Sequence, residues 1–222
     1  QVGSDIDGID IGDYSGTSVS LSDDGSVVAI GSRSRSDEVG YARIYKNINN
    51  NWTQLGSDIK GEDNDDYFGL SVSLSADGSV VAFGAPQSHY DRWFGTRSGY
   101  VRIYKNVNNT WTKVGEDIDG EGSTDSSGRS VSLSADGSIV AIGAHLNDGN
   151  GENSGHVRIY KNVNNTWTKI GEDIDGEEVW DKLGSSVSLS ADGSVVAIGA
   201  PGHDANEHQT GSGQVRIYKN IN

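Results

Sequence analysis

The chain contains no cysteine and no methionine, has only two prolines, and shows no long apolar run. Without cysteine it has no disulfide framework, thiolate zinc site or cysteine nucleophile, and it is indifferent to redox conditions. No apolar stretch approaches the roughly 18 residues of a membrane-spanning helix, so we expect no membrane insertion. No signal peptide is recognisable, and Met is missing even at position 1, so we expect a processed chain or an excised segment.

Basic residues are also scarce, since 17 Lys and Arg stand against 32 Asp and Glu, for a formal net charge of −15. Such a charge repels phosphate backbones, so we expect no nucleic-acid partner and no binding to anionic membranes. Hydrophobic residues make up only 33% of the chain, whereas glycine is abundant with 31 residues. This composition is typical either of a disordered chain or of many short strands joined by tight turns.

Three recurring blocks favour short strands over a disordered chain. The first reads SVSLSDDGSVVAIGS at 18–32 and returns at 71–85, 130–144 and 186–200. The second contains RIYKN and lies at 41–47, 100–106, 156–162 and 214–220, and the third, which contains WT and GxDIxG, lies at 51–61, 110–120 and 166–176, with a remnant at 1–8. The predicted repeats are about 9–61, 62–120, 121–176 and 177–222 plus 1–8, within one domain of residues 1–222.

Each block is typical of β-structure. Val and Leu alternate with Ser in SVSLS, which is the period of a strand with one apolar face. The Asp-Gly pair that follows predicts a type I′ hairpin with positive φ at both central residues. VRIYK alternates again, and WTKVG is rich in aromatic and β-branched residues. Four strands per repeat of about 56 residues predict a propeller blade, so we predict an all-β, four-bladed β-propeller with four antiparallel strands per blade.

The two chain ends predict how this ring closes. Residues 1–6 resemble an outer strand without a blade, whereas the last repeat stops just after its third strand. Because a bare strand edge is a template for uncontrolled pairing, we expect Gln1–Ile6 to pair with Val215–Lys219, so that the N-terminal strand closes the last blade. The same pairing between chains would be strand donation and would build a head-to-tail filament.

Residues 68–104 carry the order FGxSVSLS, VAFGAP and GYVRIY, which resembles the FG-GAP repeat of integrin α-subunit propellers and many secreted proteins. The resemblance covers the whole chain in four copies. The FG pair is complete only at Phe68-Gly69, and GAP only at 84–86 and 199–201. A short hairpin stands where integrin-type repeats carry a calcium loop, so those calcium sites are not carried over. The resemblance implies an extracellular or cell-surface protein with protein or glycan partners.

Two sets of aspartates recur in the repeats. Asp13, Asp66, Asp125 and Asp181 each lie three residues before a glycine. These carboxylates could ring a central channel and hold Ca²⁺, although turn chemistry favours a capping role for each within its own turn. The aspartates of GxDIxG are also compatible with a cation, but a solvated turn is the favoured interpretation.

Other candidates lie in loops. Four insertions at 32–39, 86–98, 145–154 and 201–212 are expected on one face, where binding usually resides. One of them gathers His89, Tyr90, Arg92, Trp93, Phe94 and Arg97. Such a cluster is typical of a ligand-binding loop, and folding back on the propeller rim is the alternative. Asn51, Asn108 and Asn164 fit the N-x-[ST] glycosylation signal if the source is eukaryotic, and turn chemistry is their alternative role.

The sequence shows no nucleophile elbow, phosphate-binding glycine loop or HExxH motif. We therefore expect no enzyme and no cofactor, with Ca²⁺ as the one candidate ligand. The predicted function is a non-enzymatic extracellular structural or adhesion module that binds partners or self-assembles. A lectin-like propeller that binds carbohydrate through its insertion loops and a subunit of a head-to-tail extracellular filament are the alternatives, and an enzyme on a propeller scaffold ranks below them.

Overall fold

The computed structural model describes residues 1–33, 39–64, 66–86, 98–204 and 211–219. Every regular element in these ranges is a β-strand, so the predicted all-β class is confirmed. No helix among them has the length and apolar character that crossing a bilayer requires.

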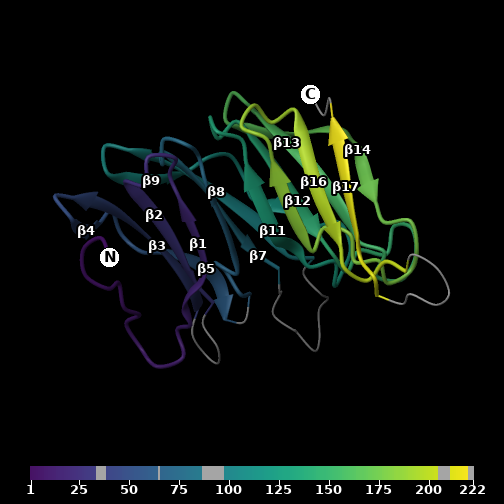
Figure 1. Cartoon of the computed structure of the whole chain (residues 1–222), viewed down its shortest axis with the longest axis horizontal. Helices are drawn as coiled ribbons and strands as arrows, with labels where there is room; N and C mark the ends of the chain where they lie inside the picture. The colour runs from purple at the N-terminus through teal and green to yellow at the C-terminus, as the bar shows by residue number, and fades with distance from the viewer. Residues whose placement is uncertain (34–38, 65, 87–97, 205–210, 220–222) are drawn as a thin grey trace.

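The strands form four antiparallel sheets that follow one another along the molecule in chain order (Figure 1). Sheet 1 contains β1 (Ser15–Leu21), β2 (Val27–Ser32), β3 (Val39–Ile48), β4 (Asn51–Gln54) and β5 (Ile59–Asn64). Sheet 2 contains β6 (Ser71–Leu74), β7 (Val80–Ala85), β8 (Tyr100–Val107), β9 (Thr110–Lys113) and β10 (Ile118–Asp119). Sheet 3 contains β11 (Ser127–Leu133), β12 (Ile139–Ala144), β13 (His156–Val163) and β14 (Thr166–Asp175), and sheet 4 contains β15 (Ser186–Leu189), β16 (Val195–Ala200) and β17 (Gln214–Lys219).

The hairpin at each Asp-Gly pair differs from the predicted type I′ turn. Between β1 and β2 the Gly25 N–H donates to the Ser22 carbonyl over 2.9 Å, and Gly25 has a φ of +67°. Asp24 has no positive φ, and its carboxylate accepts a hydrogen bond from the Ser22 hydroxyl over 2.7 Å. The positive-φ pair occurs instead at Asn108-Asn109, with φ values of +52° and +64°, between β8 and β9. Asn tolerates positive φ, so the Asn-Asn pair, and not the Asp-Gly pair, forms the two-residue hairpin turn.

In sheets 1 and 2 the GxDIxG segment bends at its first glycine and enters a short strand at its isoleucine, and in sheet 3 most of the segment lies in β14, so the interpretation as a solvated turn was wrong for the second half of these three segments. β5 pairs with β3, β10 pairs with β8, and the second half of β14 pairs with β13. Ile59 and Ile118 are only 6% and 5% exposed, which shows why the backbone stays extended. Each isoleucine places its side chain in the core, and the sheet satisfies the backbone groups around it.

The hydrophobic core lies between consecutive sheets. One cluster joins sheets 1 and 2 around Ile44, Phe68 and Phe83, whose two phenyl rings lie 5.3 Å apart. A second joins sheets 2 and 3, and a third joins sheets 3 and 4. The sheets therefore pack face to face as blades, and sheets 2 and 3 each have one face toward the preceding blade and one toward the next.

Serines of the SVSLS strands link neighbouring blades. The Ser18 hydroxyl donates to the Gly69 carbonyl over 2.7 Å, and the Leu74 N–H donates to the Ser20 hydroxyl over 3.0 Å. The same pairs of bonds recur between the later blades. The serine-bearing face of the SVSLS strand in each of sheets 1 to 3 therefore contacts the next blade.

The predicted closure by Gln1–Ile6 is wrong. This segment forms no strand, and β17 pairs only with β16 among the described residues. The Val2 carbonyl instead accepts a hydrogen bond from Trp52 Nε1 over 2.9 Å, as the Leu55 carbonyl does from Trp111 Nε1 over 2.7 Å. Residues 1–6 thus lie where the outer segment of a preceding blade would lie, because the Trp52 indole N–H needs an acceptor there.

Candidate binding surfaces

The four aspartates that precede the glycines by three residues each hold their own turn. They are 1–4% exposed, and Asp66 accepts hydrogen bonds from the N–H groups of Glu62, Asp63 and Phe68. The Tyr100 hydroxyl donates to the same carboxylate over 2.7 Å. Desolvation and the adjacent Asp66 charge raise the pKa of Tyr100, so this hydroxyl stays a donor at all ordinary pH values.

The other three aspartates are satisfied in the same way, with a different side-chain donor in each later blade. Asp13 accepts from Tyr41, Asp125 from the Asn147 amide over 2.9 Å, and Asp181 lies 3.0 Å from His203 Nδ1. The capping interpretation therefore describes these contacts. In the described part of the chain, the group of acidic and histidine side chains that lie close enough together to share a metal ion includes none of these four aspartates. Calcium binding by Asp13, Asp66, Asp125 and Asp181 stays a prediction.

In sheets 1 and 2 the aspartate of GxDIxG pairs with the arginine of the RIYK strand. Arg102, which is 6% exposed, donates to both oxygens of Asp117 over 2.8 and 2.7 Å and also contacts Glu62. Burial alone would raise the pKa of Asp117, but the hydrogen bonds from Arg102 and Lys113 lower it below its usual range. Arg43 and Asp58 repeat the pair in sheet 1. Sequence reasoning missed these pairs, although Arg and Asp recur together in every repeat.

The predicted ligand-binding residues His89, Tyr90, Arg92, Trp93, Phe94 and Arg97 lie outside the described residues. The lectin-like alternative depends on them and stays a prediction. Of the three glycosylation candidates, Asn108 and Asn164 lie in exposed turns, whereas Asn51 is the exposed first residue of β4. Their accessibility fits the signal, and their modification stays a prediction.

One outer face of the molecule, here called the leading face, belongs to sheet 1. Val19 and Leu21 point outward from β1 and are 65% and 59% exposed. In sheet 2 the corresponding residues Val72 and Leu74 pack in the core against sheet 1. The leading face therefore presents the side chains that each later blade buries against the blade before it.

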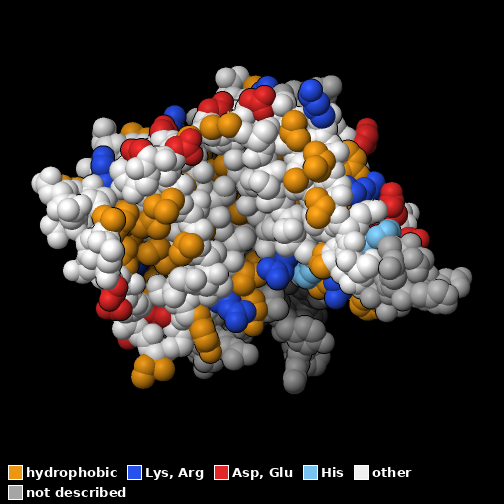
Figure 2. Space-filling model, in the orientation of Figure 1, with side chains coloured by type: hydrophobic (Ala, Val, Ile, Leu, Met, Phe, Trp, Pro, Cys, Tyr) orange, Lys and Arg blue, Asp and Glu red, His pale blue; other side chains and the backbone are white. Residues whose placement is uncertain are grey.

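The opposite outer face, here called the trailing face, belongs to sheet 4. Val215 and Ile217 of β17 are each 70% exposed, whereas Val101 and Ile103 at the same positions of sheet 2 are 0% and 2% exposed. Figure 2 shows hydrophobic side chains gathered over β1 and β2 at one end and over β16 and β17 at the other. The two faces are the halves of an interblade interface.

A glycine on each blade lets the next blade approach closely. A Cβ on Gly143 would overlap the carbonyl oxygen of Gly184, and Gly84 has the same relation to Gly128. The corresponding Gly199 on the trailing face has only atoms of Ser186 near its hypothetical Cβ. The backbone shape that receives another blade is therefore already present at the trailing face.

A groove of about 590 Å³ runs between the outer hairpins of sheets 1 and 2. It is lined by Lys46, Thr53, Gln54, Leu55 and Asn109, among others. Lys46 is its one titratable side chain, so this groove offers no pair of groups for acid–base chemistry.

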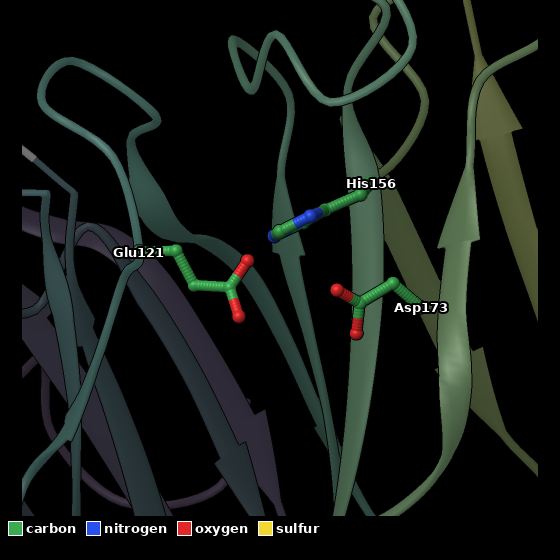
Figure 3. A group of neighbouring side chains, drawn as sticks. All are labelled: Glu121, His156 and Asp173. Carbon is green, nitrogen blue, oxygen red and sulfur yellow. The ribbon is translucent and has the colours of Figure 1, made fainter.

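One buried histidine departs from the repeat. His156 begins β13, where sheets 1 and 2 have Tyr41 and Tyr100. It is 2% exposed, and its Nε2 is buried without a hydrogen-bond partner among the described residues. Figure 3 shows its ring reaching toward the carboxylates of Glu121 and Asp173. One ligand atom from each of the three side chains lies within 4.8 Å of the other two.

Comparisons with known proteins agree with this architecture. Residues 117–160 match the FG-GAP repeat family, so the resemblance inferred from sequence is confirmed in one full span from β10 to β13. No sequence among the curated proteins compared matches the chain.

The fold is similar to solved β-propeller proteins at low sequence identity. Sqt1 from Chaetomium thermophilum matches with a TM-score of 0.60 and 13% identity over 94% of this chain and 44% of its own. Hydrazine synthase from Kuenenia stuttgartiensis matches with 0.58 and 11% identity over 90% of this chain and 57% of its own, and TolB from Acinetobacter baumannii with 0.50 and 15% identity over 91% and 40%. The chain thus spans about half the length of these structures, and the propeller fold is shown.

Proposed function

We propose that this FG-GAP-like β-propeller chain is a non-enzymatic structural module that assembles with a second copy of itself. The trailing face of each copy stacks on the leading face of the other. The observation that carries the proposal is the exposure of Val215 and Ile217 at positions that every internal blade buries. Burying one such side chain is worth about 1.5–3 kcal/mol, so the two faces together offer a substantial driving force.

Polar groups support the same partner. Ser186 and Ser188 on β15 correspond to Ser18 and Ser20, which bond to the Gly69 carbonyl and the Leu74 N–H of the next blade. On the leading face, Gly16 and Leu21 offer the matching carbonyl and N–H groups. A blade of the same repeat complements both the apolar side chains and the hydrogen-bonding groups of these end faces. An unrelated protein surface would not be expected to complement both.

The greater length of the similar propeller structures favours a closed ring of two copies. Structures that superpose on 90–94% of this chain extend well beyond it, with 44–57% of their own length covered. Two copies of four sheets give eight blades, which lies within the range of about 4–8 for propellers. A head-to-tail contact closes when its rotation allows it and otherwise grows into a filament. An extracellular location with an adhesive role is part of the proposal and rests on the FG-GAP resemblance.

Light scattering during size-exclusion chromatography tests the assembly. We expect a particle of twice the 23.5 kDa chain mass, which dissociates on dilution. Ile217→Asp and Val19→Asp should each give monomers, because each places a charge in one half of the interface. Val163→Asp is the matched control, since Val163 is 51% exposed at the outer hairpin of sheet 3 and away from both faces.

Mixing the two monomeric variants sharpens the test. The mixture has one undamaged interface, formed by the trailing face of Val19→Asp and the leading face of Ile217→Asp. We therefore expect partial recovery of the dimer in the mixture. A wild-type chain that stays monomeric at all concentrations would refute the proposal, and an open series of masses would replace the ring by the filament.

A further inference from the structure

The histidine at the start of β13 changes the contacts that its repeat position makes elsewhere. In sheet 2 the Tyr100 hydroxyl reaches Asp66, whereas the corresponding Asp125 is met by the Asn147 amide. His156 is therefore released from the turn aspartate of its blade. Its Nε2 is enclosed by the interface between sheets 2 and 3 with no donor or acceptor among the described residues. An imidazole nitrogen buried without a partner is costly, so the site calls for an explanation.

The carboxylates beside this ring are arranged differently from their counterparts in the preceding blade. There Arg102 binds both Glu62 and Asp117. Arg158, by contrast, binds Glu121 over 2.9 Å and the Asp119 carbonyl over 2.9 Å. Asp173 is bound by Lys169 over 2.7 Å instead. The change leaves Asp173 facing the imidazole rather than held in a two-pronged arginine pair.

Each of these ion pairs occupies one carboxylate oxygen. Arg158 lies against Oε1 of Glu121, and Lys169 donates to Oδ1 of Asp173. The second oxygen of each carboxylate is then available to bind an ion together with the imidazole (Figure 3). The side chains come from both sides of an interface, since Glu121 lies in the connection after β10 and the other two in sheet 3.

We propose that Glu121, His156 and Asp173 form a binding site for a divalent transition-metal ion of the Zn²⁺ class. One imidazole nitrogen and two carboxylate oxygens form a ligand set that Zn²⁺ accepts, with a water molecule as the fourth ligand. Ca²⁺ and Mg²⁺ fit less well, because they prefer all-oxygen ligands. Burial, and then the Arg158 charge, lower the pKa of His156, so one of its ring nitrogens is unprotonated at neutral pH.

The neighbouring cations set the expected strength of the site. Arg158 and Lys169 repel a divalent ion, so binding should be weaker than at a closed structural zinc site and should weaken as pH falls. A bound ion would tie the connection after β10 to sheet 3. It would therefore stabilise the folded chain by mass action.

Calorimetric titration of the purified chain with Zn²⁺, together with Co²⁺ absorption spectra, tests the site. We expect one ion per chain and a raised melting temperature with Zn²⁺. His156→Tyr restores the residue that sheets 1 and 2 carry, so it should fold while it weakens binding at least about tenfold, or 1.4 kcal/mol, and removes the thermal shift. His145→Gln is the control, because His145 lies in the turn directly after β12 and outside the cluster.

Asp173→Asn provides a second variant with almost unchanged shape. It should also weaken Zn²⁺ binding and remove the Co²⁺ band of the site. Equal affinity and stoichiometry in the wild-type chain, His156→Tyr and Asp173→Asn would mean adventitious binding to the acidic surface and would overturn the proposal. Absence of Zn²⁺ binding to the wild-type chain would overturn it too. Neither result depends on whether the chain dimerises through its end faces.

Discussion

The close approach of neighbouring blades makes a sharp prediction for one glycine. Gly143→Ala would place a Cβ against the Gly184 carbonyl oxygen, far inside the ordinary contact distance of 3.4 Å. The blades must then separate locally by roughly 1 Å, because a carbonyl in a strand connection cannot rotate away alone. The Ser130 hydroxyl, which donates to that carbonyl over 2.8 Å, would lose its acceptor. Overpacking and the lost hydrogen bond together should lower the free energy of unfolding by about 2–4 kcal/mol.

Chemical denaturation measures this change, and Gly199→Ala is its matched control. Gly199 lies at the same position of β16, and Ser186 stands beside it as Ser130 stands beside Gly143. Among the described residues no backbone of a further blade lies near Gly199, so measurements on the dilute monomer should show a change within about 0.5 kcal/mol. Equal destabilisation by the two substitutions would show that the intrablade serine, and not the approach of the next blade, makes glycine necessary.

Three further predictions concern charge. Arg102→Gln should destabilise the chain by about 3 kcal/mol in denaturant unfolding, because it leaves Asp117 partly buried without its two-pronged partner. Burial lowers the pKa of His145 to about 4 from 6.5, so the unfolded chain binds the proton more readily; stability should be full above about pH 6.5, fall toward pH 4, and fall less steeply in His145→Gln. Burial would raise the pKa of Asp136, but hydrogen bonds from Ser134 and Ser138 outweigh burial and lower this pKa below its ordinary value of 3.8. The contribution of Asp136 to the stability of the fold should therefore be present above pH 3.8 and be lost as acid is added, and acid titrations of the Asp136→Asn variant check this.

The strands were predictable from the sequence because successive side chains of a strand lie on opposite faces of its sheet. Val80, Ala82 and Gly84 face one blade, whereas Val81 and Phe83 face the other, and the same alternation returns in β12 and β16. Such a pattern tells which residues share a face of a strand. It does not tell what lies opposite that face. For this reason the alternation in SVSLS predicted a strand with one apolar face, but not that its serines bond to the next blade.

Ring closure failed as a prediction for a related reason. Residues 1–6 were recognised correctly as the end of a repeat, but the partner was chosen from strand edges alone. The indole N–H of Trp52 decides the placement, because Trp111 and Trp167 bind the preceding outer segment in the same way. That signal was present in the sequence, since Trp recurs two residues after each Asn turn. It becomes informative only when one considers which acceptor the buried indole N–H must find.

The candidate metal site was hidden by the same repetition that revealed the fold. Glu121 and Asp173 have counterparts in other repeats, where an arginine binds them, so neither residue is informative alone. His156 is the informative residue, because its position before the constant RIYKN run holds Tyr41 and Tyr100 in the first two repeats, and Gln214 in the fourth. A tyrosine at this position completes the turn of its own blade, whereas the shorter imidazole leaves a buried nitrogen beside two carboxylates. In a chain of near-identical blades, chemistry particular to one place begins with a residue that breaks the pattern, and here the repeated neighbours Arg158 and Asp173 also make contacts that differ from those in sheet 2.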